Sequence, residues 1–148
     1  MATDMERILE DFAGAWSSHD VEKIASFFAG DAVYEEVPLG TFNRGGEEGV
    51  KAFAAGTFAA MPDFKVELSS VFGAGDWAAG EGILTGTQTG EMPPFPATGK
   101  RISVPFAMIA EAQDGTLKRI ALYWDLSTFL RQLGLGPEAP PWVGASAD

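Results

Sequence analysis

One carboxylate stands at the junction between an apolar strand pattern and a short helix pattern, where an acid could face a pocket and move protons. This residue is Asp125, which follows Tyr123 and Trp124 and precedes a helical stretch that stops at Gly134. Burial among aromatic side chains would raise the pKa of Asp125 and suit it to proton transfer near neutral pH. An aspartate directly before a helix is also a favoured N-cap. Both roles are open, and they do not exclude each other.

Other side chains could bind a substrate beside such a base. Tyr34 and Glu36 are two positions apart in a strand pattern, so they share one face and could supply polar groups to a pocket. Gln88 offers an amide that can orient a substrate or stabilise an oxyanion but cannot shuttle protons near neutrality. Tyr123 and Trp16 complete the predicted substrate-binding residues. Structural alternatives stay open for two of these residues: a plain polar strand residue for Gln88 and a core aromatic for Trp16.

The composition excludes several classes of site. There is no cysteine, and the sole histidine, His19, cannot form a multi-histidine metal site. The glycines at 40, 45 and 46 lack the spacing of a phosphate-binding loop. A formal net charge of −11, without a basic run, opposes nucleic acid and anionic membranes. We expect no metal, no cofactor, no nucleic acid or membrane partner, and a cytoplasmic location.

Hydrophobic spacing predicts the elements that must position these residues. Helices are expected at 5–16, 21–28, 50–61 and 126–133; strands at 32–37, 64–72, 77–89, 101–110 and 116–124; and loops at 39–46 and 90–100. The chain has 148 residues, of which 46% are hydrophobic, which suits a single domain over 1–148. Helices followed by a run of strands indicate an α+β fold, with helices on one face of a mainly antiparallel sheet.

The later strands are apolar on both faces. Val104, Phe106 and Met108 alternate with residues that are also apolar, Pro105 and Ala107 among them. One face can cover the helices, which leaves the other for a second copy of the chain. We therefore expect a homodimer.

Several short motifs occur in an order that is typical of one family. They are His19-Asp20, the strand from Asp31 to Glu36, the turn from Met61 to Phe64, the stretch from Gly86 to Gly90, the stretch from Pro96 to Arg101, and the ending from Asp125 to Gly134. Together they resemble the SnoaL-like polyketide cyclases, within the superfamily of nuclear transport factor two and ketosteroid isomerase. The resemblance covers nearly the whole chain. It implies a cone, a cystatin-like α+β barrel, with helices on the concave face of a curved sheet and a pocket at the wide end.

The resemblance also implies a chemistry. In the cyclases an aspartate matching Asp125 is the acid/base of an intramolecular aldol closure that needs no cofactor, and many members have a histidine where Gln88 stands. We expect a cyclase-like or isomerase-like enzyme that acts on a small hydrophobic carbonyl compound. An epoxide hydrolase or dehydratase is an alternative, for which Arg101 with Asp125 supplies part of an Asp-Arg-Asp network. A non-catalytic, dimeric ligand-binding module is the other.

Overall fold

The computed structural model describes residues 3–44 and 47–136. The elements in chain order are α1 (Asp4–Ser17), α2 (Val21–Ser26), β1 (Phe28–Glu36), the 3-10 turn η1 (Val37–Leu39), β2 (Thr41–Arg44), α3 (Glu47–Ala60), β3 (Lys65–Ala74), β4 (Trp77–Thr87), β5 (Arg101–Gln113), β6 (Thr116–Trp124) and α4 (Leu126–Gln132). Within these described ranges no helix is long and apolar enough to cross a membrane.

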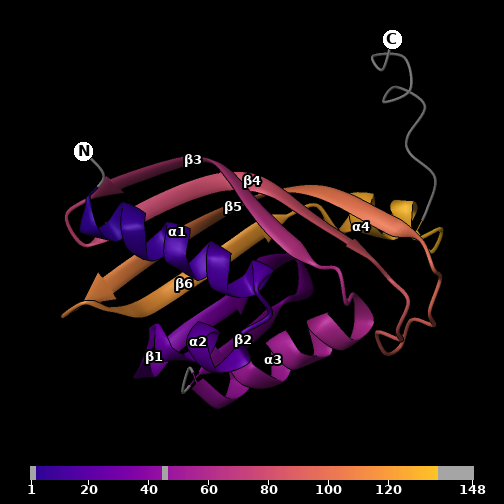
Figure 1. The fold of residues 1–148 in the computed structure, drawn as a ribbon, viewed down its shortest axis with the longest axis horizontal. Helices are drawn as coiled ribbons and strands as arrows, with labels where there is room; N and C mark the ends of the chain where they lie inside the picture. The colour runs from indigo at the N-terminus through magenta and orange to yellow at the C-terminus, as the bar shows by residue number, and fades with distance from the viewer. Residues whose placement is uncertain (1–2, 45–46, 137–148) are drawn as a thin grey trace, which may run out of the picture.

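The strands form one curved, open sheet in the order β2-β1-β6-β5-β4-β3 (Figure 1). All neighbouring pairs are antiparallel except β1 and β6, which run parallel. The predicted α+β fold with a mainly antiparallel sheet is therefore confirmed. The parallel pair joins the first strand of the chain to the last.

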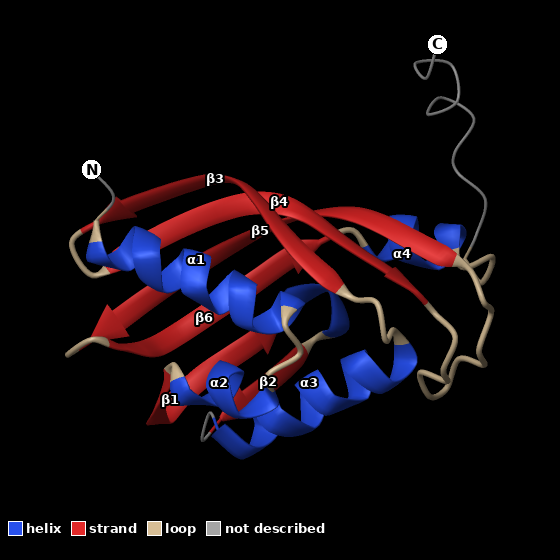
Figure 2. Cartoon of the chain, in the orientation of Figure 1, coloured by secondary structure: helices blue, strands red, loops and turns tan. Residues whose placement is uncertain are grey.

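The helices α1, α2 and α3 lie on the concave side of the sheet, and α4 lies at one end of it (Figure 2). α1 runs along β3 and β4, while α2 and α3 pack together nearer β1. A capping box begins α1, since the Thr3 side chain accepts from the Glu6 backbone and the Glu6 side chain accepts from the Thr3 backbone. Glu6 also accepts a hydrogen bond from the backbone of Gly73 in β3, at 3.1 Å. These contacts hold the apolar stripe of α1, with Phe12 and Trp16, against the sheet.

Turn chemistry sets the long β5–β6 hairpin. Asp114 and Gly115 have φ of 54° and 83°, the left-handed pair that a tight two-residue hairpin needs. The sequence predicted this turn correctly.

Two predicted boundaries were wrong. Phe28 begins β1 instead of ending the second helix, because it lies opposite Leu117 in the parallel pair. Thr41–Arg44 forms β2 where a loop was predicted, because these residues pair with the second half of β1. In both cases pairing between distant segments overrides the local pattern.

Candidate functional site

A cavity of about 470 Å³ lies between the concave face of the sheet, α1, α3, α4 and the loop at 88–100. Its walls are mainly apolar, and nine of the lining side chains are aromatic: Phe12, Trp16, Tyr34, Phe53, Phe64, Phe95, Phe106, Trp124 and Phe129. Two carboxylates line it, those of Glu36 and Glu91. Among the described lining residues none is a lysine, arginine or histidine. A cavity of this size and polarity suits a small hydrophobic molecule.

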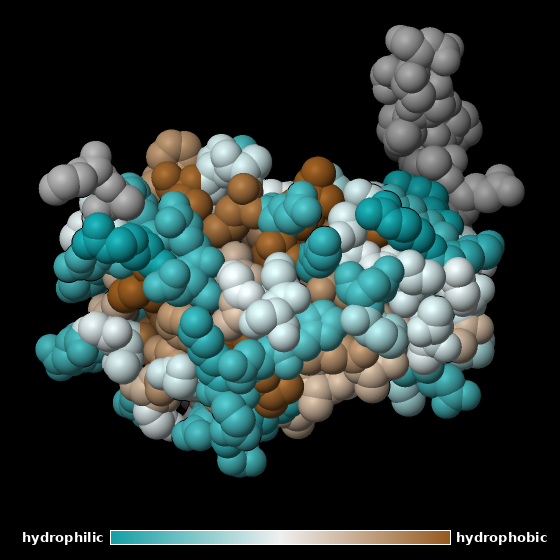
Figure 3. Space-filling model, in the orientation of Figure 1, coloured by the Kyte–Doolittle hydropathy of each residue, from teal (hydrophilic) through white to brown (hydrophobic). Residues whose placement is uncertain are grey.

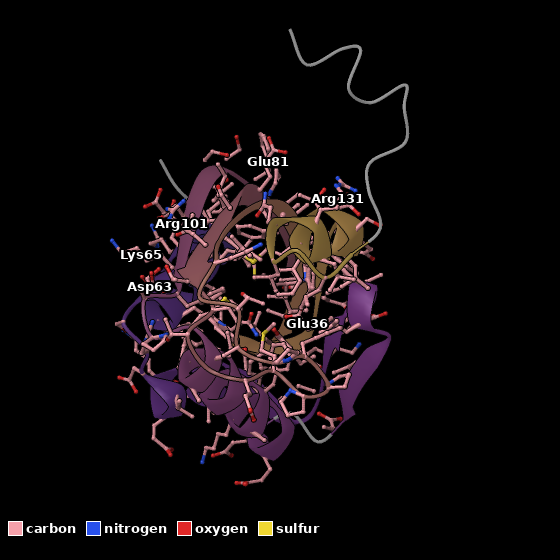
Figure 4. The ribbon with its side chains drawn as sticks, turned by 90° about the vertical axis from the view of Figure 1, so that its right-hand side faces the viewer. Glu36, Asp63, Lys65, Glu81, Arg101 and Arg131 are labelled. Atoms are coloured by element: carbon pink, nitrogen blue, oxygen red, sulfur yellow. The ribbon has the colours of Figure 1, made fainter. Side chains whose placement is uncertain are left out.

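Glu36 brings the carboxyl group into this wall. The alternation of β1 puts Tyr34 and Glu36 on the buried face, as the sequence predicted, and Glu36 is only 4% exposed. The Tyr34 hydroxyl donates a hydrogen bond to Oε1 of Glu36. Trp124 Nε1 donates to Oε2, at 2.8 Å. Figure 4 shows Glu36 toward the middle of the molecule, whereas the other labelled charged residues lie nearer its edge.

The pKa of Glu36 is set by a balance between burial and these hydrogen bonds. Burial raises it from an ordinary 4.5 to about 7, and the hydrogen bonds from Trp124 and Tyr34 oppose that rise. Burial, followed by the neighbouring Glu36, raises the pKa of Tyr34 well above its usual range, so this phenol stays protonated. Glu36 can therefore take up or release a proton near neutral pH.

The two oxygens of Glu36 have different partners. An indole N–H only donates, so Oε2 accepts from Trp124 whether the carboxyl is ionised or neutral. A hydroxyl can donate or accept, so the Tyr34 hydroxyl can reverse its role when the proton is on Oε1. The Tyr34 hydroxyl can therefore stay hydrogen-bonded to Oε1 in both protonation states of the carboxyl.

Trp16 completes the group of predicted residues that the structure brings together. Its ring stacks on that of Tyr34, with centroids 6.4 Å apart and an interplanar angle of 19°. Both rings line the cavity beside Glu36. Substrate binding by Trp16, Tyr34 and Glu36 stays a prediction.

Asp125 lies elsewhere. It is the N-cap of α4 and accepts hydrogen bonds from the Ser127 backbone, at 3.0 Å, and from Thr128 Oγ1, at 2.6 Å. The Asp125 side chain is exposed and is not among the residues that line the cavity. The hydrogen bond from Thr128, followed by the backbone N–H of Ser127, lowers the pKa of Asp125, so the predicted rise was wrong.

Strand geometry explains this placement. Side chains alternate along β6, so the strand places Trp124 in the cavity wall and directs its neighbours Tyr123 and Asp125 away from the cavity. Tyr123 is 40% exposed and, like Asp125, does not line the cavity. An aromatic neighbour in the sequence is therefore no sign that Asp125 itself is buried.

Gln88 is fully buried and engaged by the 88–100 loop. Its Nε2 donates to the Pro96 carbonyl at 3.0 Å, and its Oε1 accepts from the Thr98 backbone at 3.2 Å and from Thr98 Oγ1 at 2.6 Å. Gln88 does not line the cavity, although the loop it holds contributes Glu91 and Phe95 to the wall. The amide thus acts on the loop in this structure, and its contact with substrate stays a prediction.

Arg101 is the first residue of β5 and lies at the same edge of the molecule as Asp63 (Figure 4). Asp63 accepts from the backbone N–H of Thr87 at 2.6 Å and from its hydroxyl at 2.8 Å. These two bonds, with a smaller effect of the Arg101 charge, lower the pKa of Asp63. Arg101 does not line the cavity.

The family model described as SnoaL-like polyketide cyclase matches residues 6–133. The chain belongs to the SnoaL-like polyketide cyclase family. No curated protein sequence matches the chain significantly.

Solved structures share the fold of this SnoaL-like chain. AclR from Streptomyces galilaeus, a proposed hydroxylase, has a TM-score of 0.81 at 21% identity, over 97% of this chain and 89% of its own. IdmH from Streptomyces antibioticus, a proposed polyketide cyclase, has a TM-score of 0.71 at 26% identity, over 86% and 96%.

A third neighbour carries the fold name in its description. It is a hypothetical protein with a ketosteroid isomerase-like fold from Catenulispora acidiphila, solved in complex with trimethylamine. Its TM-score is 0.77 at 24% identity, over 90% of this chain and 97% of its own. The resemblance seen in the sequence motifs is thereby confirmed at the level of family and fold.

Two members of the site escaped the sequence analysis as polar groups: Trp124, whose indole bonds Glu36, and Glu91 in the loop. The signal for Trp124 was its spacing of two positions from Leu122, which puts both side chains on the strand face that lines the cavity. Nothing local marks Glu91, because its position depends on how the 88–100 loop folds over the SnoaL-like cone.

Proposed function

We propose that the chain is a cofactor-independent acid/base enzyme, of cyclase or isomerase type, acting on a small hydrophobic carbonyl compound, with Glu36 as the proton-transfer residue. The observation that carries this proposal is a buried carboxyl in the wall of an aromatic cavity, with a pKa of about 7. A general base works best when its pKa lies near the working pH. The family membership supports the reaction class.

Glu36 is a better candidate than Asp125 on three grounds. It lines the cavity, it is buried, and its pKa is raised, whereas Asp125 is exposed, caps a helix and has a lowered pKa. An exposed carboxylate of low pKa is a weak base. The reaction class inferred from the sequence is kept, and the proposed acid/base residue changes.

The proposed cycle leaves Glu36 unchanged. Ionised Glu36 takes a proton from a carbon next to the substrate carbonyl, and the C–H electron pair passes into an enolate. In a cyclisation the enolate carbon attacks a second carbonyl of the same molecule, whose oxygen becomes an alkoxide. Protonated Glu36 then returns its proton to that oxygen. In an isomerisation the proton returns to another carbon of the enolate system. Neither path needs an oxidant or a reductant.

The hydrolase alternative is less favoured by the site. An Asp-Arg-Asp network needs a guanidinium at the reacting oxygen, and no arginine is among the described residues of the cavity wall. The Arg101 charge acts instead on Asp63. We therefore do not assign Arg101 a role in the reaction.

Exchange of a carbon-bound hydrogen for deuterium tests the first step without the natural substrate. The bicyclic ketone 2-tetralone has acidic hydrogens next to its carbonyl, and its exchange in D₂O can be followed by proton NMR against buffer alone. We expect the wild type to accelerate this exchange, and Glu36→Gln to lose the acceleration by about 10²- to 10⁴-fold. Asp125→Asn should retain it, because Asn can still cap α4.

The two variants separate the two candidate bases. Loss of exchange in Asp125→Asn with retention in Glu36→Gln, both folded by circular dichroism, would return the role to Asp125. No acceleration by the wild type over a series of cyclic ketones and 1,3-diketones would count against the whole reaction class and favour a ligand-binding module.

A further inference from the structure

The charged groups of the cavity are all of one sign. Glu36 in β1 and Glu91 in the 88–100 loop line it, and no cationic side chain does so among the described residues. The phenol of Tyr34 also lines this wall, and it stays protonated. The formal net charge of the whole chain is −11, and this charge attracts cations and repels anions at long range.

The rest of the wall suits a cation that carries a hydrophobic body. Aromatic rings attract ammonium groups, and the cavity that Glu36 lines is walled by the rings of Trp16, Tyr34 and Trp124. Each oxygen of Glu36 accepts one hydrogen bond from the protein. A carboxylate oxygen has two acceptor sites, so each retains capacity for an N–H of a ligand.

An anion has no comparable partner among the described residues that line this cavity. Burial already disfavours the negative charge of Glu36 itself. A second carboxylate would be desolvated by the same apolar wall and would meet no cationic side chain among the described residues there.

From these observations we propose that the cavity binds protonated hydrophobic amines, with the ammonium group against the carboxylate of Glu36, and that it rejects carboxylates of the same skeleton. This goes beyond the proposed function, because binding an amine requires no proton transfer to or from carbon. The amine occupies the position of the proposed base, so it also inhibits the exchange reaction.

Calorimetric titration of the wild-type protein with three probes of one skeleton tests the charge preference. The probes are 2-naphthylmethylamine, 2-naphthalenemethanol and 2-naphthoate, which are cationic, neutral and anionic at about pH 8. We expect the amine to bind about tenfold more tightly than the alcohol, and the naphthoate to bind most weakly of the three. Equal or tighter binding of the alcohol or the naphthoate, or no binding of the amine, overturns the proposal.

Substitution locates the effect. Glu36→Gln should remove most of the amine's advantage over the alcohol, while Glu91→Gln, at an exposed position, should reduce it by less than about threefold. Glu81→Gln is the matched control, since it removes one negative charge from an exposed site at the edge of the molecule (Figure 4). An unchanged preference in Glu36→Gln, or an equal loss in Glu81→Gln, contradicts the assignment of the ammonium to Glu36.

Proton release provides a second readout. Near pH 7 a bound ammonium should ionise Glu36, so amine binding releases protons, which titrations in two buffers of different ionisation heat will detect. From about pH 8 to about pH 6 the amine affinity should fall about tenfold as Glu36 is protonated. If amine binding still releases protons in Glu36→Gln, the protons come from a group other than Glu36. The 2-tetralone exchange can fail while these binding results hold, so the two proposals are tested separately.

Discussion

Trp124 Nε1 donates a hydrogen bond of 2.8 Å to Oε2 of Glu36, across 88 positions of sequence. The same indole packs edge-to-face on Phe129 of α4, with ring centroids 5.4 Å apart. Asp125, the next residue, caps that helix. Trp124 thus joins Glu36, the proposed base, to α4, the helix that closes one side of the cavity.

Trp124→Phe should raise the pKa of Glu36 further above its ordinary value. The substitution keeps an aromatic ring against Phe129 but removes a hydrogen bond that favours the ionised carboxyl. A carbon-13 NMR titration of the Glu36 side-chain carboxyl measures this directly. Tyr34→Phe should also raise the pKa of Glu36. A lower Glu36 pKa in either variant would show that these hydrogen bonds do not favour the ionised carboxyl.

Stability should depend on pH through Glu36. Its pKa is higher in the folded chain, about 7, than the ordinary 4.5, so folding favours the protonated form. The contribution is fully present below about pH 4.5 and is lost as the pH rises through about 7. Its size is on the order of 3 kcal/mol. Urea unfolding of the wild type and of Glu36→Gln at a series of pH values isolates it, because the other groups cancel. Parallel curves for the two proteins would show that Glu36 titrates normally.

Asp125→Ala should lower the free energy of unfolding by about 1 kcal/mol, the usual cost of losing an N-cap. The side chain now bonds the Ser127 backbone and the Thr128 hydroxyl, and alanine can do neither. Asp125→Asn should recover most of the loss. Denaturant unfolding provides the measurement, and a destabilisation of several kcal/mol would mean that Asp125 has a buried partner.

Gln88→Leu should cost about 1–3 kcal/mol of stability, because it removes three part-buried hydrogen bonds that join the Gln88 amide to the Pro96 carbonyl and to Thr98. Hydrogen exchange should become faster at 89–99, the loop that contributes Glu91 to the cavity wall. Gln113→Leu, at an exposed strand end, is the matched control. Equal effects of the two substitutions would show that the amide of Gln88 does not hold the loop.

The outer face of the sheet should pair with a second copy of the chain. Phe72, Trp77 and Ile83 are exposed there, at 67%, 44% and 43%, and Figure 3 shows hydrophobic surface over β3 and β4. A stable pair should bury at least about 1,000 Å² in total. Light scattering at micromolar concentration should give a dimer mass, and Ile83→Glu should shift it toward the monomer. A monomeric wild type would refute the homodimer.

Local patterns predicted the elements that pack by themselves. The helical stripe of α1, the turn at Asp114 and Gly115, and the shared face of Tyr34 and Glu36 all follow from periods and turn residues within a few positions. The family motifs then predicted how these elements assemble. The curved sheet with helices on one face was therefore visible in the sequence.

The site depended on contacts that no local pattern contains. Glu36 owes its raised pKa to burial under distant elements, and Trp124 reaches it only because β1 and β6 pair. The aromatic neighbours of Asp125 predicted its burial, although the alternation that puts Trp124 in the cavity wall leaves Asp125 exposed. Gln88 was recognised as polar, but its partners appear only once the 88–100 loop closes on it.

The position of β6 in the sheet affects how the protein folds during translation. β6 stands between β1 and β5, so the first two strands reach the other three only through a strand that is synthesised after them all. Until it emerges, β1 lacks its parallel neighbour and Glu36 lacks Trp124. Pairing between strands that are distant in sequence is slow, because the chain between them loses entropy before the contacts can stabilise the fold. The nascent chain therefore exposes unpaired strand edges until β6 has been synthesised, and aggregation competes with folding during that time.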